Sequence, residues 1–581
     1  MDAAEQEGID EELVEFVLRE SLEDAYKPPS RQPDRKASNS DDVMKIIAAI
    51  HEGDVAALRD LSSRASAFRD ADGRGRLPLH AAAAQPRRDV LHAVLQALAA
   101  ADASLEEPTE DGDTALTLAA DAGLPEHVRA LLQHGASPHS TNGRNESPLL
   151  LAVRQRSCDM VLALIRGGAF VEQVCLTKWT AIHEAAKTGC PAVLMLLLRH
   201  GAKVTARDGH GVTPLGIAAE HGNTEALDIL IQHGGDVNAQ ASNGDTVLYD
   251  ASGSGNLDCV RLLLRHGANP NVASYAHQLP VHRAAYEGHA LVLRTLVPVT
   301  TKRAIRLSGQ SPVHSAADGG QVQCLELLIQ RGFDVNALLG AHISENYGDL
   351  RKSTLYFAVC NGDVTCAERL LAAGARTDLD PLRCILVAIR AERYELVRLL
   401  LSHGAEVNCY FRVVCDTAFP TALQYCLRDP LMLRLLLNSG YQAHTCFQCC
   451  HGNEEATDPA WADLHHQAYD AYSRPDPVPF CDFVSVSWLA HVAGGVVRTL
   501  LDYVSHVSIC PGLRRVLQRA PEWEEISELL SGPRSLQHLC RLLIRRHMSL
   551  RVLNDPAVMA AVPFPPRLKS YLTFRELDLS V

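Results

Sequence analysis

The chain has 581 residues, of which 47% are hydrophobic and 21% charged, so it exceeds one ordinary core and is not dominated by disorder. Its formal charge of −14 argues against a nucleic-acid partner, and no apolar run approaches the roughly 20 residues that cross a bilayer, so no membrane association is predicted. Seventeen singly scattered cysteines and an acidic N-terminus without an apolar leader predict a reduced protein of the cytoplasm, with the nucleus as a second compartment.

Residues 1–26 predict an acidic amphipathic helix. In "DEELVEFVLRESLED", Asp10 to Asp24, acidic residues precede a pattern of apolar, serine and acidic positions, which resembles a ubiquitin-interacting motif. The resemblance implies ubiquitin contact through Val14, Leu18, Ser21 and Asp24. Val17 stands where the motif usually has alanine, and the alternative is a solvated helix without a partner. Residues 27–40, "KPPSRQPDRKASNS", predict a flexible linker.

Residues 41–450 repeat one phrase, which returns as "WTAIHEAAKTG", "VTPLGIAAEHG" and "QLPVHRAAYEG". Each phrase carries one apolar anchor, and the five intervals from Leu116 to Val281 are 33 residues each. The repetition predicts about 11–12 helical units. The anchors are Leu79, Leu116, Leu149, Ile182, Leu215, Leu248, Val281, Val313, Leu355, Ile385 and Leu423.

The residues of each phrase predict a pair of short helices. Thr213 is suited to cap the first helix and Pro214 to open it, while Gly267 after "CVRLLLRH" suits the left-handed end of the second. The period and wording resemble the ankyrin repeat. That resemblance implies an all-α solenoid with a long concave surface that binds proteins. From Val313 to Leu355 the interval is 42 residues, which predicts an extra loop, "ALLGAHISENYGDLRK".

Hairpin tips between the units are the candidate target-binding residues, because they project from the stack and contribute little to its core. We expect the regular central units to present Asp208, His210, Asn243, Asp245, Tyr275 and His277. Tyr275 places an aromatic ring where a turn usually has a polar residue; the alternative is that it lies on a neighbouring hairpin. The recurring histidine of "LPLH" and "LPVH" is interpreted as a hydrogen-bonding turn residue rather than a catalytic base.

Two further patterns in the array admit a chemical interpretation. Asn238, Asn336 and Asn408 have a context like that used by the asparaginyl hydroxylase that acts on ankyrin repeats, or they are simply consensus hairpin residues. The spacing of Cys446, Cys449, Cys450 and His451, with Cys481 beyond, could hold zinc. Because no second cysteine pair follows at finger spacing, loop and core cysteines are favoured, and no metal or cofactor is predicted.

The repeat wording stops after residue 450. Residues 451–480 predict a loop or insert, and residues 481–530 a helical extension. Within residues 531–581, the stretch "PRSLQHLCRLLIRR" at 533–546 predicts a helix that carries Leu536, Leu539, Cys540, Leu543 and Ile544 on one face and arginines towards the other.

This stretch resembles the SOCS box, and ankyrin repeats followed by it are typical of the ankyrin repeat and SOCS box family. The resemblance implies that Leu536, Leu539, Cys540 and Ile544 bind elongin C of the elongin B/C pair. A second element, "VPFPPRLKSYL" at 562–572, resembles the family's cullin-binding segment and implies contact with the cullin numbered five and its RING protein; Val562 stands where leucine is usual. Its matching residues are Pro563, Pro565, Leu568, Tyr571 and Leu572.

The expected function is therefore substrate recognition within a cullin-RING ubiquitin ligase, with catalysis on other subunits and the target protein unidentified. No glycine-rich phosphate loop, GxSxG elbow or HExxH helix is found in the sequence. The alternative is an ankyrin scaffold that assembles no ligase. "SLQHLC" and "VPFPPRLKSYL" discriminate between the two, because a scaffold needs neither.

Overall fold

The computed structural model describes residues 40–72, 75–100, 103–349, 351–411, 417–449, 477–486, 488–548, 552–553 and 556–574. The proposed ubiquitin contacts Val14, Leu18, Ser21 and Asp24 lie outside this part of the chain, as do Cys450, His451 and most of the insert at 451–480. Contacts divide the chain into two compact units, Met1–Ala181 and Ile182–Val581.

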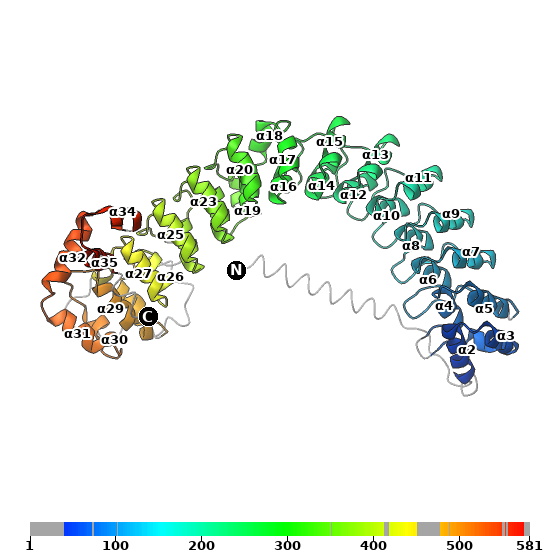
Figure 1. Ribbon diagram of the computed structural model, residues 1–581, viewed down its shortest axis with the longest axis horizontal. Coiled ribbons are helices and arrows are strands. Elements are labelled where there is room, and N and C mark those ends of the chain that lie inside the picture. Colours follow the sequence, from blue (N-terminus) through cyan, green and yellow to red (C-terminus); the bar gives the residue numbers. More distant parts are fainter. Residues whose placement is uncertain are drawn as a thin grey trace. The chain divides into compact units, whose positions relative to one another are not determined.

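Both units are built from pairs of short helices (Figure 1). The first unit contains α2 (Ser40–Glu52), α3 (Val55–Leu61), η1 (Ser62–Arg69), α4 (Pro78–Ala83), α5 (Arg88–Ala100), α6 (Ala115–Asp121), α7 (Pro125–Gln133), α8 (Pro148–Arg154) and α9 (Cys158–Arg166).

The second unit continues the helix pairs and then carries the C-terminal helices. Its repeat helices are α10 (Ala181–Thr188), α11 (Pro191–Arg199), α12 (Pro214–Glu220), α13 (Thr224–Gln232), α14 (Val247–Ser254), α15 (Leu257–Arg265), α16 (Pro280–Tyr286), α17 (Ala290–Leu296), α18 (Lys302–Leu307), α19 (Pro312–Asp318), α20 (Val322–Gln330), α21 (Ala341–Ser344), α22 (Thr354–Cys360), α23 (Val364–Ala372), α24 (Cys384–Arg390), α25 (Tyr394–Ser402), α26 (Ala422–Cys426), α27 (Pro430–Asn438) and η2 (Ala443–Phe447). The later helices are α28 (Phe480–Ser485), α29 (Ala490–Leu501), α30 (Pro511–Leu517), α31 (Trp523–Ser531), α32 (Leu536–His547), α34 (Pro556–Ala561) and α35 (Pro566–Leu572).

The signals expected at the helix ends are present. The Thr213 hydroxyl accepts a hydrogen bond from the backbone N–H of Gly216, and Pro214 takes the first turn of α12. Gly267 has the left-handed φ of 85° that ends α15. All eleven predicted anchors are buried, none more than 2% exposed, which confirms the register of the repeat.

In the second unit the helices form two layers (Figure 1). Helices α12, α14, α16 and α19 pack side by side as the first-helix layer, and α13, α15, α17 and α20 form the layer behind it. The predicted long interval after Val313 contains α21 and a backbone bridge between Leu338 and Ser353. The additional helix α18 was not predicted; its N-cap is Thr301, whose hydroxyl accepts from the Ala304 N–H.

The recurring histidines are hydrogen-bonding turn residues, as expected. The Leu77 N–H donates to His80 Nδ1 at 3.0 Å, and His80 Nε2 lies 2.8 Å from the Glu107 carbonyl. The Ser311 N–H donates to His314 Nδ1 in the same way. Burial lowers the pKa of the equivalent His282 to about 3, so this ring is neutral at physiological pH.

The three asparagines of the hydroxylase-like pattern each join two successive units. The Asn238 amide donates to the Gly267 carbonyl at 3.2 Å and accepts from the Asn269 N–H at 2.8 Å. Asn336 and Asn408 make the equivalent pair of bonds to the next unit. A structural role therefore accounts for all three.

Beyond the repeats, α29 packs against α27, and α28 packs against η2, α29 and α30, so the helical extension continues directly from the last repeat. A small separate core of Leu553, Met559 and Leu572 lies among the last helices. None of the helices in the described ranges combines the length and apolarity needed to cross a membrane.

Candidate functional site

Helix α32 presents an exposed apolar face. Leu536 is 77% exposed, Leu543 57% and Leu539 39%, and the Cys540 side chain is also exposed. The Ser535 hydroxyl accepts from the His538 N–H and caps the helix, which fixes where this face begins. Four apolar or thiol groups in one stripe on a capped helix are a suitable surface for a partner protein.

Arg541 and Arg545 of the same helix point inward, whereas Arg546 is exposed. Arg541 is 8% exposed, and its guanidinium lies 3.3 Å from the ring centroid of Tyr571 and 4.3 Å from that of Phe574. Arg545 donates to the carbonyls of Leu572 and Asn438 at 2.6 and 3.2 Å. The charged side therefore anchors α32 on aromatic rings and backbone oxygens, and leaves most of the apolar side outside.

Ile544 departs from the expected grouping. Its side chain is partly buried and packs against the small core of Leu553, Met559 and Leu572. It therefore supports α32 from inside, whereas Leu536, Leu539, Cys540 and Leu543 form the exposed stripe. The reason is that Ile544 lies at the edge of the stripe that adjoins Arg541 and Arg545, and this side of α32 rests on α35.

The predicted cullin element divides in the same way. Pro563 and Pro565 are exposed, whereas Leu572 is fully buried and Leu568 packs against the same core. Tyr571 is half-buried beneath Arg541. The expectation of five contact residues is thus corrected for Leu572, whose buried side chain holds the segment together rather than facing a partner. Val562, the departure from the family pattern, also lies against this core.

The predicted hairpin tips stack on one another. The Ser242 N–H donates to the His210 carbonyl at 2.8 Å, and the Tyr275 N–H donates to the Asn243 carbonyl at 3.0 Å. Three consecutive tips therefore form one continuous edge. His210 and Asn243 are exposed on it, and Tyr275 is 77% exposed.

Tyr275 lies on a neighbouring hairpin, which is the alternative interpretation, and it is also exposed. Its ring lies against Gly244 of the preceding hairpin, where φ is 82° and an added Cβ would come within 3.0 Å of the ring, yet most of the side chain remains exposed. His277, also exposed, has a left-handed φ of 60° and meets His342 of the extra loop with ring centroids 4.9 Å apart.

The two aspartates of this edge act mainly within their hairpins. The expectation that Asp208 is an exposed tip is wrong, because its side chain is buried. Its carboxylate accepts hydrogen bonds from the N–H groups of His210 and Val212 at 2.9 and 2.7 Å. Asp245 is half-buried and accepts from the Asn243 amide at 2.7 Å. Carboxylates in such turns replace missing backbone bonds, which explains why they lie inward.

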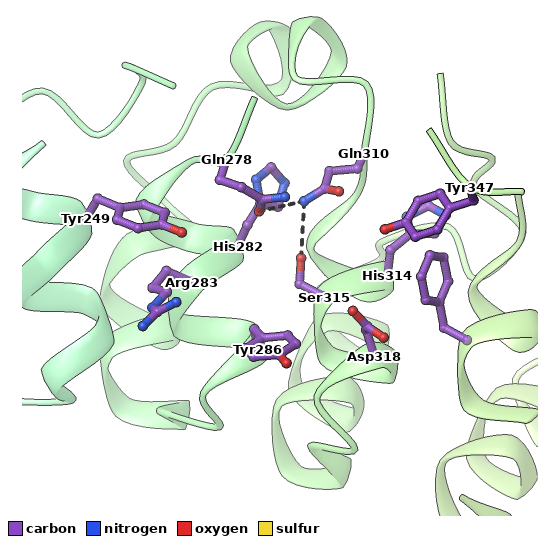
Figure 2. Close-up of a pocket in the computed structure, with 11 residues that line it drawn as sticks. Tyr249, Gln278, His282, Arg283, Tyr286, Gln310, His314, Ser315, Asp318 and Tyr347 are labelled. Atoms are coloured by element: carbon purple, nitrogen blue, oxygen red, sulfur yellow. Dashed lines mark hydrogen bonds between the residues drawn. The ribbon is translucent and has the colours of Figure 1, made fainter. Parts of the chain in front are cut away.

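A pocket of about 200 Å³ opens beside the first-helix layer, between α14 and α22. Figure 2 shows Tyr249 and Tyr347 on opposite sides of it, with Tyr286 and Asp318 between them. The extra loop supplies Tyr347, which packs on Phe357 and beneath Arg351. The full lining is Tyr249, Gln278, His282, Arg283, Tyr286, Gln310, His314, Ser315, Asp318, Tyr347 and Phe357.

Polar contacts order the walls of the pocket. Gln310 donates to the Gln278 side-chain oxygen at 2.8 Å and to the Ser315 hydroxyl at 3.4 Å, as drawn in Figure 2. Arg283 lies 3.1 Å from Glu287, and its guanidinium is 5.7 Å from the Tyr249 ring. Tyrosines, a carboxylate and amides around a concave site suit a polar or charged side chain of another protein. Sequence reasoning missed this pocket; the long interval after Val313 was the available signal.

Comparisons with known proteins agree with this arrangement. The profile "Ankyrin repeats (3 copies)" matches residues 44–142, 135–208 and 196–274, and "Ankyrin repeat" matches residues 308–338. The profile "SOCS box" matches residues 532–573, which include α32 and α35.

Individual proteins match over most of the chain. It is 43% identical to Ankyrin repeat and SOCS box protein 14 of Mus musculus, over 97% of this chain and 96% of that protein, and 43% identical to the Homo sapiens protein of the same name, over 99% and 97%. A Bos taurus protein named Dynein axonemal heavy chain 12 is 48% identical over 52% of this chain and 83% of its own length.

Among solved structures, the ankyrin repeat domain of Bcl-3 is 32% identical, with a TM-score of 0.33, over 36% of this chain and 93% of that chain. The near full-length relatives and the two kinds of matched profile decide the assignment: this chain belongs to the ankyrin repeat and SOCS box family.

Proposed function

We propose that this chain is the substrate-recognition subunit of an elongin–cullin–SOCS-box RING ubiquitin ligase. The observation that carries the proposal is the exposed stripe of Leu536, Leu539, Cys540 and Leu543 on a helix whose charged side is anchored. Such a face remains costly in water until a partner covers it, because apolar surface gains about 25 cal/mol per Å² on burial. In this proposal elongin C covers it, and Pro563 and Pro565 contact the cullin numbered five and its RING protein.

The repeats hold the target protein. Its contacts are the edge formed by His210, Asn243, Tyr275 and His277, with the neighbouring pocket receiving one projecting side chain. The target becomes ubiquitinated and is directed to the proteasome. The chain supplies no catalytic side chain; it raises the effective concentration of target lysines beside the loaded conjugating enzyme.

The test is recovery of elongin B/C with the full-length chain carrying Leu536→Ser and Cys540→Ser. Both side chains are exposed, so the free chain should keep its fold while elongin recovery falls at least tenfold, or about 1.4 kcal/mol. Gln537→Ala on the same helix is the matched control and should leave recovery unchanged. Full recovery with the double variant would refute the proposal and favour a scaffold that assembles no ligase.

A further inference from the structure

Three cysteine sulfurs from separate segments converge in the second unit. Cys449 follows η2, Cys481 lies in α28, and Cys510 precedes α30 as its N-cap. Their Sγ atoms all lie within 4.8 Å of one another, although the residues are 32 and 29 positions apart in the chain. The zinc-like pattern in the sequence therefore contained two of the three converging cysteines and lacked Cys510.

Cys446, a member of that sequence pattern, has another role. It is buried, and its sulfur lies 3.8 Å from the Tyr441 hydroxyl inside the last repeat. Cys446, which packs in the core, and Cys449, which belongs to the three-cysteine cluster, are only three positions apart. Their spacing in the sequence therefore could not show which of them joins the cluster.

The geometry of the three sulfurs suits a metal. A tetrahedral zinc ion with Zn–S bonds of about 2.3 Å holds its sulfurs roughly 3.8 Å apart, so small side-chain rotations bring these three to the required separation. Cys481 is 4% exposed, while Cys449 and Cys510 are half-buried. A bound ion would therefore be shielded by protein on one side and reachable for loading on the other.

A backbone contact already orders one of the three sulfurs. The Leu513 N–H donates to Cys510 Sγ at 3.4 Å, which holds that sulfur in place. Zinc binds cysteine in its thiolate form, so binding at these three residues would release protons.

We propose that Cys449, Cys481 and Cys510 bind one zinc ion, with a fourth ligand completing the tetrahedron. Three soft thiolates select zinc over magnesium or calcium, which prefer oxygen ligands. The ion would connect the end of the last repeat to α28 and α30. Since α29 packs on α27 and α31 on α29, this clamp would fix the helical extension to the repeats. The proposal concerns structure and holds whether or not the chain assembles a ligase.

The experiment measures metal in the full-length chain, purified without chelators from cells grown with added zinc. We expect about one zinc per chain by mass spectrometry, and at least a fivefold lower content in each of Cys449→Ser, Cys481→Ser and Cys510→Ser. Cys158→Ser and Cys360→Ser replace exposed cysteines elsewhere and should keep the metal. X-ray absorption should show about three sulfurs near 2.3 Å.

A second measurement uses the wild-type chain, so that its result does not depend on the folding of a cysteine variant. The wild-type chain treated with a strong zinc chelator should lose its metal and melt at a lower temperature, and added zinc should restore both. Three results would overturn the proposal: no zinc in the wild-type chain, equal zinc in the wild type and all three variants, or a disulfide between two of the three cysteines in unreduced protein.

Discussion

At the scale of single residues, Asp250 in α14 has a pKa far above the ordinary value for an aspartate. Burial, followed by the nearby carboxylates of Asp245 and Glu220, raises the pKa of Asp250 to about 8; Arg283 only partly opposes them. The folded chain therefore holds a proton on this carboxyl at neutral pH, whereas the unfolded chain, with a pKa near 3.8, releases it.

This difference predicts a pH-dependent stability. Between about pH 4 and pH 8 the folded state binds more protons at Asp250, so the free energy of unfolding falls as pH rises, by up to about 1.4 kcal/mol per pH unit. Asp250→Asn removes the titration. We expect the variant's melting temperature, measured relative to wild type, to increase steadily from pH 5 to pH 8.

The comparison should be made by thermal unfolding of both chains in the same buffers. Asp258→Asn, on the exposed part of α15, is the control and should show no such trend. A constant offset between Asp250→Asn and wild type across the whole range would contradict the assignment.

At the scale of elements, helix α32 is held by its charged side. The Arg541 guanidinium stacks on the rings of Tyr571 and Phe574. Arg545 donates hydrogen bonds to backbone carbonyls of α35 and α27. Planar guanidinium groups stack on aromatic rings and still donate hydrogen bonds, which a lysine cannot do equally well. The arrangement leaves the apolar stripe available to a partner.

We therefore expect Arg541→Ala to loosen the packing of α32 on α35, by roughly 1–2 kcal/mol from the lost cation–π contacts. Hydrogen exchange of the amides in both helices should become faster, and Arg541→Lys should recover only part of the protection. Leu543→Ser, at a 57% exposed position, should change exchange little. Equal effects of Arg541→Ala and Leu543→Ser would show that the arginine is not the anchor.

The exposed prolines of the second element lead to a separate prediction. Pro563→Ala with Pro565→Ala should reduce capture of the cullin about tenfold, or about 1.4 kcal/mol, while elongin B/C remains bound, because neither ring belongs to the small core. The measurement is co-purification of both partners from one sample. Arg567→Ala, exposed on α35, serves as the neutral change. Joint loss of elongin and cullin would mean that the two contacts are not separable.

At the scale of the whole molecule, the surfaces proposed for the target protein and for elongin C belong to different parts of the chain. The edge and pocket occupy residues 210–357, whereas the apolar stripe lies in α32. A substitution in one surface should therefore weaken binding at that surface and leave binding at the other unchanged, since residues without shared neighbours act independently.

Tyr275→Ala with Tyr286→Ser should accordingly reduce target capture and ubiquitination several-fold and leave elongin recovery unchanged. Tyr275 is 77% exposed and Tyr286 45% exposed, so the fold should tolerate the change. Leu291→Ser, at a 61% exposed position on the second-helix layer, is the control outside the target face. Targets would be identified by mass spectrometry with the proteasome inhibited; an unchanged target set would place recognition elsewhere.

The repeats could be predicted from the sequence alone, because most units carry an anchor, a helix cap and a left-handed glycine, and these act within a few residues of one another. The sequence also predicts the position of α32, and the family resemblance is drawn from two short segments that follow the repeats. Local patterns of this kind survive folding because ankyrin units contact mainly their neighbours along the chain.

The sequence could not show which side chains of each predicted helix are exposed, because tertiary packing determines this. Packing against Tyr571 and Phe574 holds Arg541 and Arg545 of α32 inward, and the small core removes Ile544 and Leu572 from the surface. Tertiary packing also brings Tyr347 to the pocket and places Cys510 beside Cys449 and Cys481. Each depends on contacts between segments distant in the sequence, and spacing along a chain contains no information about which of them meet.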